Sequence, residues 1–231
     1  MSEYLGPLLT NPDTIRSSII KRKKKYIEKT VSSSSKDNLE EKISLEEKDG
    51  WRRLSSKLKK NKRSFSCRLA KDKPIDEQLE DEIWTIVAKM GFHELSDGRN
   101  FTASVGPEVK PRQIDVFAKD DESALFIECT GCEEPKKKKM GSLIEKIESI
   151  RTKVYQSIKS HYKNDKLKLK WIIATRNIEW GDADLDKAKV ANIIILTDKE
   201  INYYKKLVDI YKNAAKYQFL AHIFAGESIK G

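Results

Sequence analysis

The chain has 231 residues, 38% of them hydrophobic, which is enough to bury the core of one domain with or without an appendage. Its 46 Lys and Arg against 36 Asp and Glu exclude an acidic solvating protein and favour a polyanionic partner. No apolar run approaches the ~18 residues of a membrane span, the N-terminus does not resemble a signal peptide, and the cysteines form no disulfide framework. We therefore expect a cytoplasmic protein with no membrane contact.

The positive charge is concentrated at the start of the chain. Residues 1–73 hold 20 Lys and Arg against 10 Asp and Glu, whereas residues 74–231 hold 26 of each. The first segment also has few aromatic residues, and its apolar residues are too sparse to predict a core. We therefore expect a basic, partly flexible arm and linker over residues 1–49, followed by one domain over residues 50–231.

Within the arm, a short basic helix is predicted after a cap at Asn11 or Asp13. Residues 32–50 are expected to be a linker, and residues 51–69 a strand or helix packed on the edge of the domain. The run Lys23–Lys25 is a candidate nucleic-acid contact, because lysines that neutralise phosphates release counterions. A solvated basic tail and a localisation signal remain alternatives. The apolar side of the helix would consist of Ile15, Ile19, Ile20 and Ile27.

The rest of the chain predicts an α/β domain. A helix over residues 74–90 is expected to end at Gly91, and strands over 100–105, 112–118 and 124–130 to follow, the last two joined by a tight turn. Alternation in the second of these strands would put Ile114, Val116 and Ala118 on one face. Helices and strands then alternate, which predicts a mixed sheet of about five strands with helices on both faces. The later helices are expected over 142–161, 184–190, 199–211 and 214–224, and the later strands over 170–175 and 193–197.

Two carboxylates lie inside segments that otherwise have the composition of a core. Asp115 and Glu128 each cost several kcal/mol in a buried strand unless they are paired or bind a metal. Being 13 residues apart across a tight hairpin, they are predicted to face each other on neighbouring strands. Such oxygen ligands suit Mg²⁺ or Mn²⁺, and Glu80 on the preceding helix would add a third acidic group. Pairing with Arg112 or Lys153 is the alternative.

This order of motifs resembles the PD-(D/E)XK, or restriction-endonuclease-like, nuclease superfamily. More narrowly, the stretch from Gly50 onward resembles the N-terminal nuclease-like region of DGQHR-domain proteins, in which a DGQHR domain is expected to follow. The resemblance implies that Asp115, Glu128 and Glu80 bind the metal and that Gln113 positions water or phosphate. The matching segments are residues 76–84, 90–92, 113–116, 124–129, 188–192 and 214–221.

The sequence departs from the superfamily pattern at Thr130. The pattern has a lysine two residues after the Glu, where its ammonium group steadies the transition state. A threonine hydroxyl carries no charge, so a replacement cation would have to come from the run Lys136, Lys137, Lys138 and Lys139 or from the next helix, through Lys146 or Lys153. The same run is a candidate phosphate contact, with a solvated loop as the alternative.

One further motif is a C-x-x-C, at Cys129 and Cys132. Zinc would need two more ligands, and redox chemistry would need an accessible thiol, so we set both aside. The sequence thus predicts a Mg²⁺-dependent DNA endonuclease domain, in a DNA-modification, restriction or phage-defence context. The alternatives are an inactive nuclease-fold module that binds nucleic acid and a protein-interaction subunit, and a homodimer or a partner subunit is compatible with each.

Overall fold

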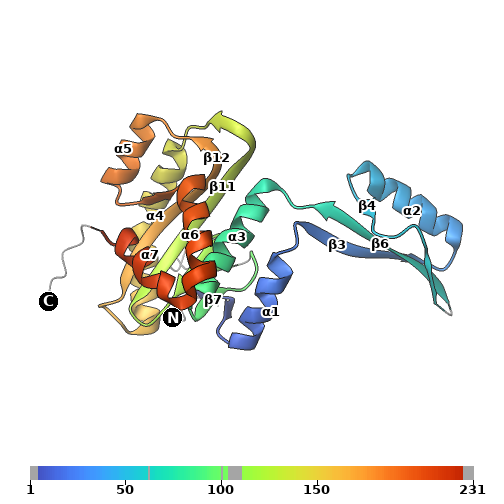
Figure 1. Cartoon of the computed structure of the whole chain (residues 1–231), viewed down its shortest axis with the longest axis horizontal. Coiled ribbons are helices and arrows are strands. Elements are labelled where there is room, and N and C mark those ends of the chain that lie inside the picture. Colours follow the sequence, from blue (N-terminus) through green and yellow to red (C-terminus); the bar gives the residue numbers. More distant parts are fainter. Residues whose placement is uncertain (1–4, 62, 100, 104–110, 226–231) are drawn as a thin grey trace. The chain divides into compact units, whose positions relative to one another are not determined.

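In the computed structural model, residues 5–61, 63–99, 101–103 and 111–225 are described, and the chain divides into two compact units (Figure 1). Unit 1 consists of residues 1–22 and 75–231, and unit 2 of residues 23–74. The expected division after residue 49 differs from this one. Residues 23–49 fold together with residues 50–74, and the first helix of the supposed arm belongs to unit 1.

Unit 1 is built on a mixed sheet, as the sequence predicted. Three of its strands are parallel to one another, and the other three continue the sheet in antiparallel order. The sheet has six strands rather than about five. Their order is β13 (Ile194–Leu196), β12 (Lys168–Glu179), β11 (Ser123–Lys137), β10 (Val116–Lys119), β7 (Glu94–Ser96) and β2 (Leu8–Leu9).

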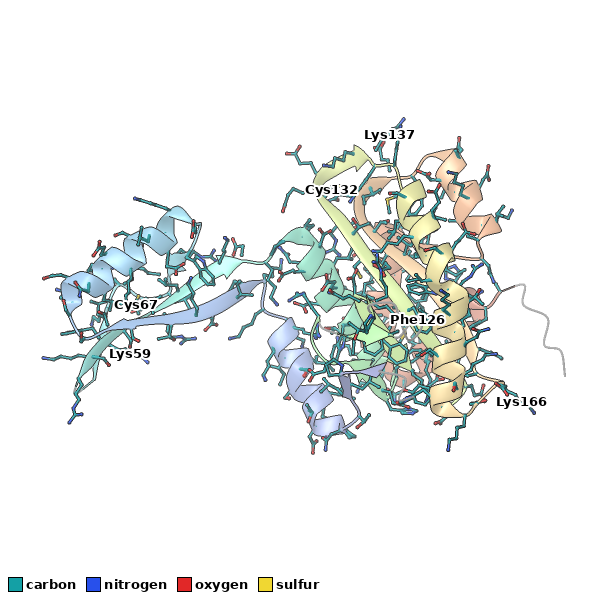
Figure 2. The ribbon with its side chains drawn as sticks, turned by 180° about the vertical axis from the view of Figure 1, so that it is seen from behind. Lys59, Cys67, Phe126, Cys132, Lys137 and Lys166 are labelled. Carbon is teal, nitrogen blue, oxygen red and sulfur yellow. The ribbon has the colours of Figure 1, made fainter. Side chains whose placement is uncertain are left out.

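Helices cover both faces of this sheet, because the central strands are apolar on both sides. Leu125 and Ile127 of β11 pack in one core and Phe126 in the other, and Figure 2 shows Phe126 in the middle of the sheet. Within the described residues, no helix is long and apolar enough to cross a bilayer. The first face is covered by α1 (Pro12–Arg22), α3 (Ile75–Lys89), α6 (Asp198–Tyr211) and α7 (Ala215–Ile223), which the 3₁₀ turn η1 (Lys212–Ala214) precedes, and the second by α4 (Gly141–Tyr162) and α5 (Asp182–Val190).

The strand expected over residues 112–118 is interrupted. Arg112–Gln113 form β9, which pairs with β8 (Thr102–Ala103) in a separate small sheet that also contains β1 (Leu5–Gly6). The chain bends at Ile114 and Asp115 before β10 begins. As a result Ile114 packs with the second core and not with Val116 and Ala118, as alternation had suggested. Of the strand expected over 100–105, residues 100, 104 and 105 lie outside the described residues.

Unit 2 has a core of its own, which corrects the prediction of a linker over residues 32–50. The helix α2 (Lys36–Lys48) begins after Ser35, whose hydroxyl accepts a hydrogen bond from the backbone of Asn38, and it buries Leu39 and Ile43 one turn apart. These pack with Cys67 and Leu69 of a four-stranded antiparallel sheet. Ile27 lies in that sheet rather than in the first helix. The strands are β3 (Tyr26–Ser33), β4 (Arg52–Arg53), β5 (Lys59–Asn61) and β6 (Ser64–Asp72).

Because Leu39 is fully buried in this small core, replacing it should destabilise unit 2 and leave unit 1 folded. We expect Leu39→Ala to cost about 2–5 kcal/mol and to speed amide exchange in residues 23–74, as measured by hydrogen–deuterium exchange mass spectrometry. Leu45→Ala is the matched control, since Leu45 lies on the same helix and is 58% exposed. Equal effects of the two substitutions would contradict a core in unit 2.

Candidate active site

The candidate site lies where β10 ends and β11 continues without it. The last pair of the ladder is Val116 with Ile127, so Asp115 comes opposite Glu128, as the hairpin predicted. Beyond this pair, two backbone N–H groups of β11 bond to carboxylates instead of a strand. Cys129 N donates to Asp115 Oδ2 at 2.8 Å, and Gly131 N donates to Asp76 Oδ1. One oxygen of Asp115 is thus used to complete the sheet.

Glu128 is the most unusual group of the site. Its side chain is buried, with the residue only 6% exposed. Its Oε1 has no hydrogen-bond partner among the described residues. Burial, followed by repulsion from Asp115, raises the pKa of Glu128 to about 8. The carboxyl group is therefore largely protonated at pH 7 unless a cation reaches it.

Glu80 of α3 interacts electrostatically with both Asp115 and Glu128. Burial and the negative charge of Asp115 raise the pKa of Glu80 to about 7, and Glu80 in turn contributes to the raised pKa of Glu128. Burial also raises the pKa of Asp115, against the hydrogen bond from Cys129. Mutual repulsion among buried carboxylates is the arrangement that a divalent cation would relieve.

Sequence reasoning did not identify Arg99, which the structure places against these acids. Its Nε donates to Glu80 Oε2 at 2.6 Å, and its guanidinium group lies 3.2 Å from Glu77 Oε2. Gln113 Nε2 donates to the carbonyl oxygen of Arg99 at 2.8 Å, so this side chain contacts the backbone of Arg99. Arg99 follows a turn, and no periodic pattern in the sequence marks its position.

A cation from just beyond the end of β11 contacts Thr130, the position where the resembled pattern has a lysine. Lys138 Nζ donates to Thr130 Oγ1 at 2.7 Å. The lysine reaches this point because the pairing of β11 with β12 shifts register between Gly131 and Lys136, where extra residues loop out. Asn177 stabilises the irregular stretch through hydrogen bonds from its Nδ2 to the carbonyl oxygens of the residues at 132 and 133.

The other predicted contact residues are exposed. Lys136–Lys139 occupy the end of β11 and the residues after it, and Figure 2 shows Lys137 near the tip of that strand. Lys23–Lys25 are also exposed, in the connection between α1 and β3, where Lys24 forms an ion pair with Glu28 at 2.8 Å. They begin unit 2 and do not belong to a flexible arm.

The C-x-x-C motif forms no disulfide. Cys129 and Cys132 are free and buried, and burial raises the pKa of the Cys129 thiol, which disfavours the reactive thiolate. In the part of the chain that the structure describes, no group of three His, Cys, Asp or Glu side chains has the arrangement of a preformed metal site. Any cation at the three acids would thus have to draw them closer together.

Comparisons with known proteins give little guidance. No family model matches the sequence, and no curated protein matches it. One solved structure, of protein VC1899 from Vibrio cholerae, is similar over 88% of this chain and 51% of that protein, with a TM-score of 0.42 and 12% sequence identity. The chain thus spans about half the length of that protein.

The raised pKa of Glu128 predicts a specific pH dependence of stability. A carboxyl whose folded pKa lies above its unfolded value stabilises the fold at low pH and loses that contribution as pH rises toward about 8. Glu128→Gln keeps the group neutral. We therefore expect the variant to gain thermal stability relative to the wild type between pH 5 and pH 9, measured by calorimetry in EDTA.

Glu148→Gln is the matched control, because Glu148 is an exposed residue of α4 with no ion pair in the described part of the chain. Its stability difference from the wild type should not change with pH. If the difference between Glu128→Gln and the wild type were equally independent of pH, Glu128 would not be a buried titrating group.

Proposed function

We propose that unit 1 is a metal-dependent phosphodiesterase that cleaves nucleic acid, with DNA as the substrate class. The observation that carries the proposal is the contact of Lys138 with Thr130, two residues after the buried Glu128. A lysine held at this hydroxyl would supply the positive charge that the nuclease pattern requires and that the sequence lacks at position 130. Asp115 immediately precedes β10, and Glu128 lies on β11, which pairs with β10.

The three acids offer the oxygen ligands that a hard divalent cation prefers, but in the described residues they are not arranged as a preformed metal site. Glu128 Oε1 is buried without a hydrogen-bond partner among the described residues, and carboxylate oxygens are the ligands that Mg²⁺ and Mn²⁺ prefer. Asp115, Glu128 and Glu80 would hold the ion. When bound, such an ion stabilises negative charge on a phosphate and lowers the pKa of a coordinated water.

Other residues of the chain would stabilise the transition state and bind the substrate. The Lys138 ammonium group, oriented by the Thr130 hydroxyl, would stabilise the negative charge that develops on the phosphate oxygens during attack. The exposed Lys136, Lys137 and Lys139 would hold the flanking phosphodiester backbone. Gln113 would act as a positioning residue through Arg99. We place this activity inside the cell, where a DNA substrate is available, and a second copy or a partner subunit would be compatible with it.

A nucleic-acid-binding module without cleavage is the second candidate, and Arg99 is the observation that favours it. The guanidinium group already neutralises Glu80 and lies 3.5 Å from Asp81 Oδ2. An arginine fixed among these acids competes with a metal for the same negative charge. If the chain is a nuclease, the Glu80 carboxylate must either release Arg99 to bind the metal ion or contact Arg99 and the ion at the same time.

A cleavage assay with Lys138→Met separates the two candidates. We expect plasmid and single-stranded DNA to be cut in Mn²⁺ or Mg²⁺, and the substitution to lower kcat about 10²-fold or more, because a charge that stabilises the transition state is lost. Asp115→Asn and Glu128→Gln should abolish cleavage.

The control is Lys166→Met, which removes an exposed lysine at the end of unit 1 opposite Lys137 (Figure 2). It should cut DNA at the wild-type rate. DNA binding without metal-dependent cleavage by the wild type would overturn the nuclease and leave the binding module. Equal losses from Lys138→Met and Lys166→Met would remove the assigned role of Lys138.

A further inference from the structure

Unit 2 carries most of the net positive charge of the protein. Its residues 23–74 hold 17 Lys and Arg against 8 Asp and Glu, whereas the remaining residues hold 29 against 28. The unit buries its own apolar side chains, so this charge lies on a folded surface and not on a disordered tail. A folded basic surface can hold several cations at a fixed spacing, which a tail cannot.

The charge is separated within unit 2. Residues 36–49, which comprise α2 and its C-terminal cap, hold 6 of the acids and only 3 lysines. The strands and connections hold the other 14 Lys and Arg against 2 acids, Glu28 and Asp72. The helix packs on the sheet, so the acidic and basic parts are two sides of one small unit.

The acids neutralise cations close to the helix and along β3 and β6. Glu40 and Glu47 pair with Arg53, and Glu46 pairs with Lys29. The two acids of the strands are used in the same way: Glu28 pairs with Lys24 and Arg68, and Asp72 pairs with Arg52 at 2.8 Å. Few acids therefore remain to neutralise cations on the β5–β6 hairpin.

The β5–β6 hairpin is different. Lys57, Lys59, Lys60 and Arg63 are exposed, and none has an ion pair in the part of the chain that the structure describes. Figure 2 shows Lys59 on this hairpin and Cys67 further in, toward α2. The exposed large apolar side chains of unit 2 are Ile27, Leu45 and Leu54, and none of them lies on β5 or β6. The described residues of these two strands therefore offer no strongly exposed apolar anchor for a membrane.

We propose that the β5–β6 hairpin binds the phosphate backbone of duplex DNA through Lys57, Lys59, Lys60 and Arg63. A two-stranded ribbon fits the major groove of B-DNA, which is about 12 Å wide. Lysine and arginine contacts to phosphate position the protein without reading sequence, so this surface would hold DNA of any sequence. The inference rests on the proposed nucleic-acid substrate and assigns a surface that would hold it.

The test is the salt dependence of binding by the full chain to a 20-base-pair duplex, measured by fluorescence anisotropy in EDTA from 50 to 200 mM KCl. We replace Lys57, Lys59, Lys60 and Arg63 together by Gln. Loss of four phosphate contacts should make the slope of log K against log salt shallower by about 3 to 4, and should weaken binding more than tenfold at 50 mM KCl.

The matched control replaces four exposed lysines of unit 1 by Gln, with the same change in net charge, and should keep the slope: Lys166, Lys189, Lys199 and Lys206. A charge-conserving variant, with Lys57, Lys59 and Lys60 replaced by arginine, should also keep the wild-type slope. Because it retains the charge but alters the same positions, it separates a lost contact from a misfolded unit 2.

Equal slope changes in the hairpin variant and the unit 1 control would overturn the proposal, since net charge alone would then explain binding. So would unchanged duplex binding, or loss of binding only to vesicles of phosphatidylserine and phosphatidylcholine, which would indicate a membrane surface instead. EDTA prevents cleavage, so the result does not depend on catalysis. Hairpin-dependent binding by a chain that never cuts DNA would refute the nuclease and leave this inference intact.

Discussion

A buried carboxyl group whose Oε1 has no hydrogen-bond partner among the described residues, and whose pKa the positive charge of Arg112 lowers less than burial and Asp115 raise it, is the constraint on which the candidate site depends. Glu128 lies in a strand whose neighbours are Ile127 and the buried Cys129, and one of its oxygens has no hydrogen-bond partner in the described chain. An ionised carboxylate in such a place costs several kcal/mol. The group must therefore remain protonated, as its raised pKa indicates, or be compensated by a cation.

Three contacts near Glu128 place a hydrogen-bond donor or a positive charge against neighbouring polar side chains. Asp115 offers an oxygen to the backbone N–H of Cys129, which completes the sheet where β10 stops. Arg99 neutralises Glu80. Lys138 brings an ammonium group to Thr130 on the same strand. Each contact also has a structural role of its own, and the proposed cation would add a reason for the buried position of Glu128.

Parts of this arrangement were predictable from the sequence. The apolar spacing from Leu79 to Met90 predicted α3, and the short acidic turn fixed the register that brings Asp115 opposite Glu128. The role of Lys138 was not predictable beyond the run that contains it, because it depends on a register shift stabilised by Asn177, 39 positions away along the chain. Arg99 depends likewise on a contact between segments that no local pattern encodes.

Unit 2 was missed because its core is small and its composition is basic. Leu39 and Ile43 are spaced as on a helix, but their partners Cys67 and Leu69 lie more than 20 residues later among many cations. A composition average over residues 1–73 therefore suggested a tail. The structure shows that the charged residues lie in two different places. Acids are buried in unit 1, and cations are exposed on unit 2.

The central claim is that Asp115, Glu128 and Glu80 together bind a divalent cation. Isothermal titration of the wild type with Mn²⁺ at pH 7, repeated in two buffers of different ionisation enthalpy, tests it most directly. The account predicts one site and the release of one to two protons, because Glu128, with a pKa of about 8, and Glu80, with a pKa of about 7, must both be deprotonated to bind, and it predicts loss of the site in Glu128→Gln. Absence of binding by the wild type, or equal binding by the variant, would contradict it.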